Sequence, residues 1–208
     1  MPRPTDDPAS PPVLVGSSLG PESDDVVRSG LAIARDAASQ LVLLHVLEPQ
    51  GEVATGLLDF SMVRDGLMAA SREQLAAQLR RLGALSADVA ALAVELPPVD
   101  AALLAAADRW RPRLIVVGAN RDSSPSLRLG PVATRLLRRS RWPLWLVKSP
   151  IAAAPCICVL QGEERGERER LLTLAREAAC PVLIVPSGAS VIPVSSAAVK
   201  AEKRRESG

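Results

Sequence analysis

The stretch LIVVGANRDSSPSLRLGPVATRLLRRSRWPLWLV, from Leu114 to Val147, decides how this chain folds. It begins with a continuous apolar run, passes through a loop of serine, arginine and glycine, and ends with a second apolar run that starts at Leu144. A short helix is expected between the two runs. It can begin at Pro131, because the missing N–H of proline costs nothing in a first helical turn, and it must end before Pro143. The stretch therefore predicts two buried parallel strands joined by a helix.

The same alternation of apolar runs and helical stripes extends back to the beginning of the chain. Apolar runs predict buried strands, and apolar residues spaced three or four apart predict helices. Further strands are expected at Val13–Ser18, Leu41–Val46 and Val89–Leu96, and further helices at 23–38, 63–82 and 100–110. Strands that alternate with helices form an open, mostly parallel sheet, here of five strands, with helices on both faces. The predicted fold class is therefore α/β, and such sheets bind ligands beyond the carboxyl ends of their strands.

These elements fill residues 12–150, which we interpret as one domain. Residues 1–11 are rich in proline and aspartate without periodicity, so they are predicted to be a disordered leader. Residues 151–187 read again as strand, helix and strand (βαβ), and residues 188–208 as a flexible tail. We call residues 151–187 the appendage. Its segment AREAACPVLIV (Ala175–Val185) aligns both with ARDAASQLVLL and with LLRRSRWPLWLV, which suggests a degenerate partial second repeat. So short a unit must lie against the first domain or a partner.

The composition limits what the protein can bind. Acidic and basic residues are mixed and the net charge is only +2, so there is no strong field to attract nucleic acid or anionic lipid. No apolar run reaches the roughly 18 residues needed to cross a bilayer, and the first residues lack the apolar stretch of a signal peptide. Three cysteines make a poor disulfide framework. We therefore expect a cytoplasmic protein with no nucleic acid and no membrane as partner.

Three segments resemble the universal stress protein family. They are VLVGSS at the start of the domain, LVLLHVLEP from Leu41 to Pro49 and, most specifically, the stretch from Leu114 to Val147. The resemblance covers residues 12–150 and implies the five-stranded fold of adenine nucleotide alpha hydrolase-like proteins, with one branch of the family binding ATP. It also implies a homodimer that meets along the last strand, here residues 143–147. The appendage could either cover that edge or widen it, and we predict that the homodimer survives.

The phosphate-binding loop of the ATP-binding branch is altered in this sequence. The family places G-2x-G-9x-G-S/T between its fourth strand and fourth helix, and Gly118 matches the first glycine. Arg121 stands at the second glycine, and Gly130 matches the third only if one residue is deleted from the loop. Pro131 stands at the hydroxyl position, and the family's aspartate after the first strand falls on Ser18. By this correspondence the candidate nucleotide-binding residues are Gly16, Ser18, Val46, Val117, Gly118, Arg121, Gly130, Pro131 and Val132.

These alterations predict weak or no binding of ATP or AMP, so no cofactor is expected. Proline offers phosphate neither a hydroxyl nor an N–H, and Ser18 is neutral and shorter than aspartate. Arg121, Arg128 and the serines of the loop could instead hold an anion at the helix N-terminus. The prediction is a non-enzymatic stress-response module that acts by dimerisation and by binding an unknown partner protein. The alternative is an ATP- or AMP-binding switch or slow ATPase of the same fold.

Other motifs have a functional and a structural interpretation. GSSLG (Gly16–Gly20) with His45 resembles the nucleophile elbow of α/β-hydrolases, but it occupies the first strand, so no catalytic residue is predicted. Cys156 and Cys158 could bind a metal with Cys180 and His45, but core packing is favoured and no metal is predicted. Trp142 and Trp145 are expected to pack at the dimer edge. A solvated helix face is expected for Arg135, Arg138, Arg139 and Arg141.

Overall fold

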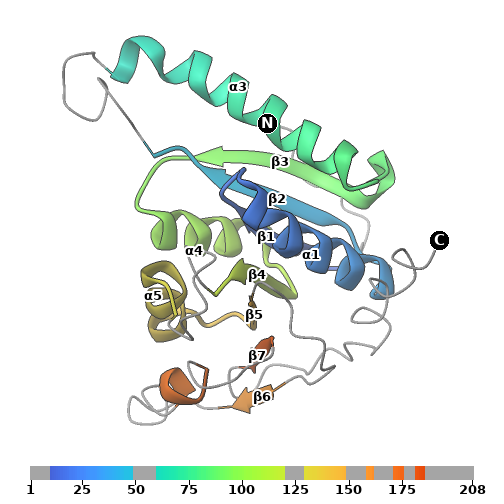
Figure 1. The fold of residues 1–208 in the computed structure, drawn as a ribbon, viewed down its shortest axis with the longest axis vertical. Helices are drawn as coiled ribbons and strands as arrows, with labels where there is room; N and C mark the ends of the chain where they lie inside the picture. The colour runs from blue at the N-terminus through green and yellow to red at the C-terminus, as the bar shows by residue number, and fades with distance from the viewer. Residues whose placement is uncertain are drawn as a thin grey trace.

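The computed structural model describes residues 10–48, 60–119, 129–148, 158–161, 171–175 and 181–185. They form one sheet with helices packed against it (Figure 1). The strands are β1 (Val13–Ser17), β2 (Leu41–Val46), β3 (Val89–Glu95), β4 (Leu114–Gly118), β5 (Leu144–Val147), β6 (Cys158–Gln161) and β7 (Val182–Val185). The helices are α1 (Asp24–Asp36), α3 (Phe60–Arg81), α4 (Val99–Trp110) and α5 (Pro131–Arg139), with 3-10 turns η1 (Pro21–Ser23) and η2 (Ser86–Asp88) and a helical stretch at 171–175. Residues 1–9 of the predicted leader and all of the predicted tail lie outside the described residues.

The sheet has seven strands in the order β3-β2-β1-β4-β5-β7-β6. The first five are parallel to one another, which confirms the predicted α/β fold with its five-stranded parallel sheet. β7 then pairs antiparallel with β5, and β6 pairs parallel with β7. The appendage thus covers the outer edge of β5 and also widens the sheet. The homodimer predicted through residues 143–147 stays a prediction, but in the described structure that strand is not an edge.

Two apolar layers, one on each face of the sheet, hold the helices in place. Leu14 points into a core that contains Leu103 of α4 and Leu136 of α5. Val13 and Val15 point to the opposite face, where the core is built from α1 and α3. Successive residues of a strand face opposite sides, so this alternation along β1 requires helices on both faces. Because helices cover both faces of the sheet, the side chains of β1 are buried on both faces and the strand reads as a continuous apolar run.

Local sequence signals set the helix ends that flank the site. α5 begins at Pro131 after the extended residue Gly130, as predicted, and ends at Arg139, before Pro143. α3 ends at Arg81, and Gly83 follows with a φ of 70°, a conformation that glycine adopts without steric cost. α1 packs closely on β1, since a Cβ at Gly30 would lie 2.4 Å from Val15 Cγ2. These signals and contacts fix where α1 and α5 begin, and both helices begin near the carboxyl ends of the strands.

Candidate functional site at the carboxyl ends of β1 and β4

The candidate site lies where strand order reverses. From β1 the sheet runs outward through β2 and β3 on one side and through β4 and β5 on the other. Open α/β sheets bind ligands at such a switch point, beyond the carboxyl ends of the strands. The loops that follow β1 and β4 are therefore the segments that would meet a ligand.

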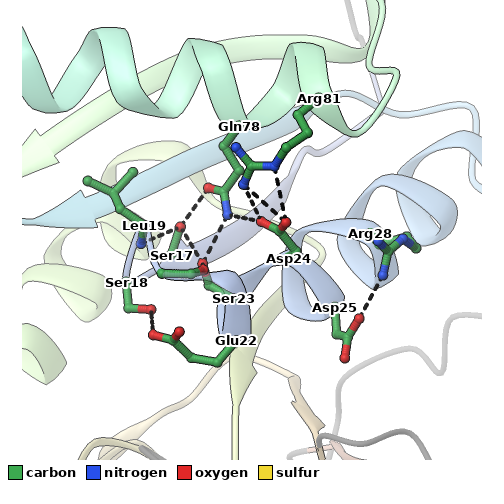
Figure 2. Close-up of polar contacts among 11 residues, drawn as sticks. Ser17, Ser18, Leu19, Glu22, Ser23, Asp24, Asp25, Arg28, Gln78 and Arg81 are labelled. Carbon is green, nitrogen blue, oxygen red and sulfur yellow. Dashed lines mark hydrogen bonds and ion pairs between the residues drawn. The ribbon is translucent and has the colours of Figure 1, made fainter.

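A buried hydrogen-bond network closes the loop after β1 (Figure 2). Ser17 Oγ donates to Gln78 Oε1 at 2.8 Å, and Gln78 Nε2 donates to Ser23 Oγ at 2.9 Å. Ser23 Oγ in turn donates to the carbonyl oxygen of Gly20 at 2.7 Å, and the N–H of Leu19 donates to Ser17 Oγ at 3.0 Å. Buried polar groups need such partners, and here the partners come from the protein itself. The network ties α3 to the end of β1 and the start of α1.

An ion pair at the rim of the network fixes the first turn of α1. Asp24 Oδ1 accepts from Gln78 Nε2 at 2.8 Å, and Arg81 Nη2 donates to both oxygens of Asp24 at 2.8 and 3.0 Å. Burial of Asp24 opposes its ionisation. The hydrogen bonds from Arg81 and Gln78 and the charges of Arg81 and Arg28 outweigh it, so the pKa of Asp24 is lowered. The carboxylate also stands at the N-terminus of α1, where the helix dipole favours negative charge.

The aspartate-equivalent position, Ser18, is already occupied with an internal contact. Its hydroxyl donates to Glu22 Oε1 at 2.8 Å on the exposed side of the loop. Leu19, which follows, has a φ of 67°, a left-handed conformation that is uncommon for a residue with a side chain. No hydrogen bond joins His45 to Ser18, both of which the structure describes; His45 Nδ1 instead lies 2.9 Å from the carbonyl oxygen of Ser17. The GSSLG motif therefore lacks the serine–histidine contact that a nucleophile elbow uses.

Three predicted site residues belong to the core beneath the loops. A Cβ added to Gly16 would lie 3.3 Å from Val117 Cγ1 and 3.4 Å from Leu103 Cδ2, so a larger residue there would press on the core. Val117 and Val46 are buried in the core on the side of α4 and α5, with exposures of 4% and 7%. All three positions lie beneath the loops, and the side chains of Val46 and Val117 belong to the apolar core.

The loop after β4 is closed at its base by backbone hydrogen bonds. The N–H of Ala119 donates to the carbonyl oxygen of Val147 at 2.7 Å, and the N–H of Gly130 donates to that of Ala119 at 2.6 Å. Gly118 ends β4, and Pro131 is exposed as the first residue of α5. Val132, next in the helix, is half-buried. Arg121 lies outside the described residues, as do Arg128 and the loop serines at 123, 124 and 126.

The arginines of α5 are only partly a solvated face, because two of them bind a buried carboxylate. Asp100, in the first turn of α4, has a side chain 3% exposed. It accepts from Arg135 Nε at 2.8 Å and from Arg139 Nη1 at 3.1 Å, while both arginines stay about half exposed. Arg141 pairs with Asp108 at 2.9 Å, near the indole of Trp142, whose Nε1 also donates to Asp108. The predicted solvated face is thus also the clamp between α4 and α5.

Sequence reasoning missed Gln78, Asp24, Arg81 and Asp100. A signal for Gln78 was present, since it lies on the apolar stripe of α3 beside the buried Leu75 and Leu79. A polar residue at a core position implies a buried partner. No comparable signal existed for Asp100, whose partners lie 35 and 39 residues away.

Neither a metal site nor a membrane span is found in the part of the chain that the structure describes. No three histidine, cysteine or acidic side chains gather there as metal ligands. None of the helices described combines the length and the apolar character needed to cross a bilayer. Cys156 and Cys180, which the metal hypothesis required, lie outside the described residues, and Cys158 begins β6.

Comparisons with known proteins agree with this architecture. Residues 11–148 match the sequence model of the universal stress protein family. UspA from Lactobacillus plantarum is 15% identical with a TM-score of 0.51, over 68% of this chain and 99% of that one. A putative universal stress protein from Pseudomonas aeruginosa is 19% identical (TM-score 0.47; 78% of this chain, 53% of that one). A universal stress protein solved in complex with cAMP is 23% identical (TM-score 0.44; 64% and 92%). A search among curated proteins gives no match.

The family match spans more than half of the chain and coincides with β1 to β5 and the helices between them. The solved universal stress protein from L. plantarum shares the fold over nearly its whole length. The chain therefore belongs to the universal stress protein family.

Proposed function

We propose that this protein is a non-enzymatic, cytoplasmic member of the family that acts by binding a partner protein and needs no ATP. One observation carries the proposal. Among the described residues at the carboxyl ends of β1 and β4, the polar groups that a nucleotide would use are replaced or already bonded to other groups of the chain.

The β1 side offers little to an adenosine group. The position of the family's aspartate is held by Ser18, and its hydroxyl is donated to Glu22. Ser17, beside it, is 7% exposed and bonded to Gln78. A ligand that bound Ser17 would have to break its buried bond to Gln78 and replace it, since an unsatisfied buried polar group costs about 1–3 kcal/mol.

The β4 side offers fewer donors to phosphate than a family-type loop does. The N–H of Gly130 is donated to Ala119, and Pro131 has no N–H and no hydroxyl. Helix N-termini bind phosphate through free N–H groups, and here neither position 130 nor position 131 offers one. This supports weak nucleotide binding at most, and therefore an activity that does not depend on ATP.

Isothermal titration of the full chain with ATP, AMP and cAMP tests the proposal. cAMP is included because one relative was solved with it. No binding in the micromolar range is expected. One-to-one micromolar binding of any of the three would overturn the proposal in favour of a nucleotide-dependent switch, and ATP turnover would point to a slow ATPase.

A pair of substitutions tests the reason for weak binding. Pro131→Ser restores both an N–H and a hydroxyl at the helix N-terminus, whereas Pro131→Ala restores the N–H alone. We expect the serine variant to bind ATP more tightly than the alanine variant. Affinity capture from stressed cells, with and without ATP, tests the rest of the proposal. The same partner should be captured in both cases.

A further inference from the structure

The last three elements repeat the geometry of β4, α5 and β5. β4 and β5 are parallel neighbours joined by α5, and β6 and β7 are parallel neighbours with the helical stretch 171–175 between them in the chain. A proline precedes both inner strands: Pro143 stands before LWLV of β5, and Pro181 before VLIV of β7. The two units meet through β5 and β7, which are antiparallel.

The strand register relates the two units by a local two-fold axis. Leu144 pairs with Ile184, Trp145 with Leu183, and Leu146 with Val182. If β7 is laid on β5 from the prolines onward, Val182 corresponds to Leu144 and Leu183 to Trp145. The pairing is therefore symmetric about the Trp145–Leu183 pair. Each inner strand also has a parallel outer neighbour, with Ile115 of β4 beside Leu144 and Cys158 of β6 beside Val182. Two identical units would make such an isologous contact.

The packing follows the same two-fold relation. An axis perpendicular to the sheet keeps equivalent helices on one face. Leu171, Leu172 and Ala175 are indeed buried in the core that contains Leu136 and Leu137 of α5. Lys148, directly after β5, fixes the end of the stretch, because its Nζ donates to the carbonyl oxygen of Ala175 at 2.7 Å. The helical stretch thus lies on the face of the sheet where the α5 of a second subunit would lie.

We propose that residues 158–185 take the place of a second subunit. The intact chain is then a monomer in which β7 covers the edge of β5. If β7 is removed, the edge fits one partner, the β5 of another copy. All four residues of β5 are at most 3% exposed, and an uncovered apolar strand edge pairs readily with an identical one. This inference goes beyond the proposed function and does not rest on it. For the intact chain it takes the place of the homodimer predicted through residues 143–147.

Light scattering after size-exclusion chromatography tests the proposal on the full chain. The unmodified protein should have the mass of one chain, 21.9 kDa. Leu183→Asp places a charge at the centre of the β5–β7 pair, where Leu183 is 3% exposed, and should release β7 and double the mass. Val94→Asp is the matched control, since Val94 is equally buried on the same face but lies in β3. It should not double the mass. A dimeric unmodified chain, or a folded Leu183→Asp chain that stays monomeric, would overturn the proposal.

Cysteine cross-linking decides the case even if Leu183→Asp does not fold. In a background with the three native cysteines changed to serine, Trp145→Cys with Leu183→Cys should form a disulfide within one chain, because directly opposed residues have close Cβ atoms. Trp145→Cys alone should give no disulfide-linked dimer. A β5–β5 dimer would bring two copies of residue 145 together, so a dimer formed by the single variant would refute the proposal. An absent intrachain disulfide in the double variant would refute it as well.

Discussion

Gln78 is the residue on which the closure of the first loop depends most. Its side chain is 2% exposed and hydrogen-bonds to three side chains that flank the loop after β1. These are Ser17 at the end of β1, and Ser23 and Asp24 at the start of α1. Gln78→Met keeps nearly the same side-chain length and volume but removes the amide. The substitution therefore isolates the hydrogen bonds from the packing.

The expected cost follows from the bonds that are lost. The bonds to the two serines join neutral groups and are worth about 1 kcal/mol each, and the bond to the carboxylate about 1.5–3 kcal/mol. Asp24 keeps Arg81, and Ser23 keeps its bond to Gly20, so the lower end of the sum applies. We expect the free energy of unfolding to fall by about 3.5 kcal/mol. With a urea m-value of about 2 kcal/mol/M, the midpoint should fall by about 1.8 M.

Urea unfolding followed by circular dichroism measures this shift, and Gln74→Met is the control. Gln74 lies one turn earlier on α3 and is exposed, so its replacement should change stability by less than about 0.5 kcal/mol. If Gln78→Met also changed stability by less than about 0.5 kcal/mol, the network would not hold the loop and the argument for its closure would fail.

Three further predictions concern the surroundings of the site. Asp100→Asn should lower the free energy of unfolding, measured in thermal melts, by about 2 kcal/mol. The loss is smaller than for a fully buried ion pair because the two arginines reach water. The control Asp108→Asn, at an exposed position, should lower it by less than about 0.5 kcal/mol. The pKa of Asp24 is lowered, so its contribution to stability is present above its unfolded pKa of about 3.9 and is lost as the pH falls through the folded value. The destabilisation caused by Asp24→Asn should therefore shrink in urea titrations from pH 6 to pH 2.5; a constant difference would contradict the ion pair. Gly16→Ala would place a methyl group 3.3 Å from Val117 Cγ1, so Val117 must shift to make room; a lowered melting temperature would show that the core is rigid there, and an unchanged one that it yields.

The parallel part of the fold could be predicted because its signals are local. Pro131 and Pro143 bracket α5, and the continuous apolar runs on either side indicate strands buried on both faces. Chain order and the handedness of βαβ units then restrict how these strands are arranged. The existence of β1 to β5 and their parallel direction could therefore be predicted without knowledge of long-range contacts.

The position of β7 could not be predicted in the same way. The run VLIV indicates a buried strand, but burial does not specify which neighbour covers it or in which direction it runs. Of the two alignments open for Ala175–Val185, the one with LLRRSRWPLWLV places Pro181 on Pro143, and only this one agrees with the register. The contacts of the site could not be predicted for the same reason, because local sequence patterns do not specify long-range neighbours. Gln78 contacts Ser17 and Asp100 contacts Arg135, and both pairs are distant in the chain.

The antiparallel pair of β5 and β7 also has a consequence for synthesis on the ribosome. β5 is made before β7, and roughly 40 residues separate Val147 from Val185, so at about 5–20 residues per second the two ends of this interval are synthesised about 2–8 s apart. From the moment β5 leaves the ribosome until β7 follows it, a chain that has folded its first five strands carries an open β5 edge. On a polysome, neighbouring nascent chains present the same edge to one another. The order in which the strands are made thus sets a time window for premature pairing between chains, and the arrival of β7 ends it.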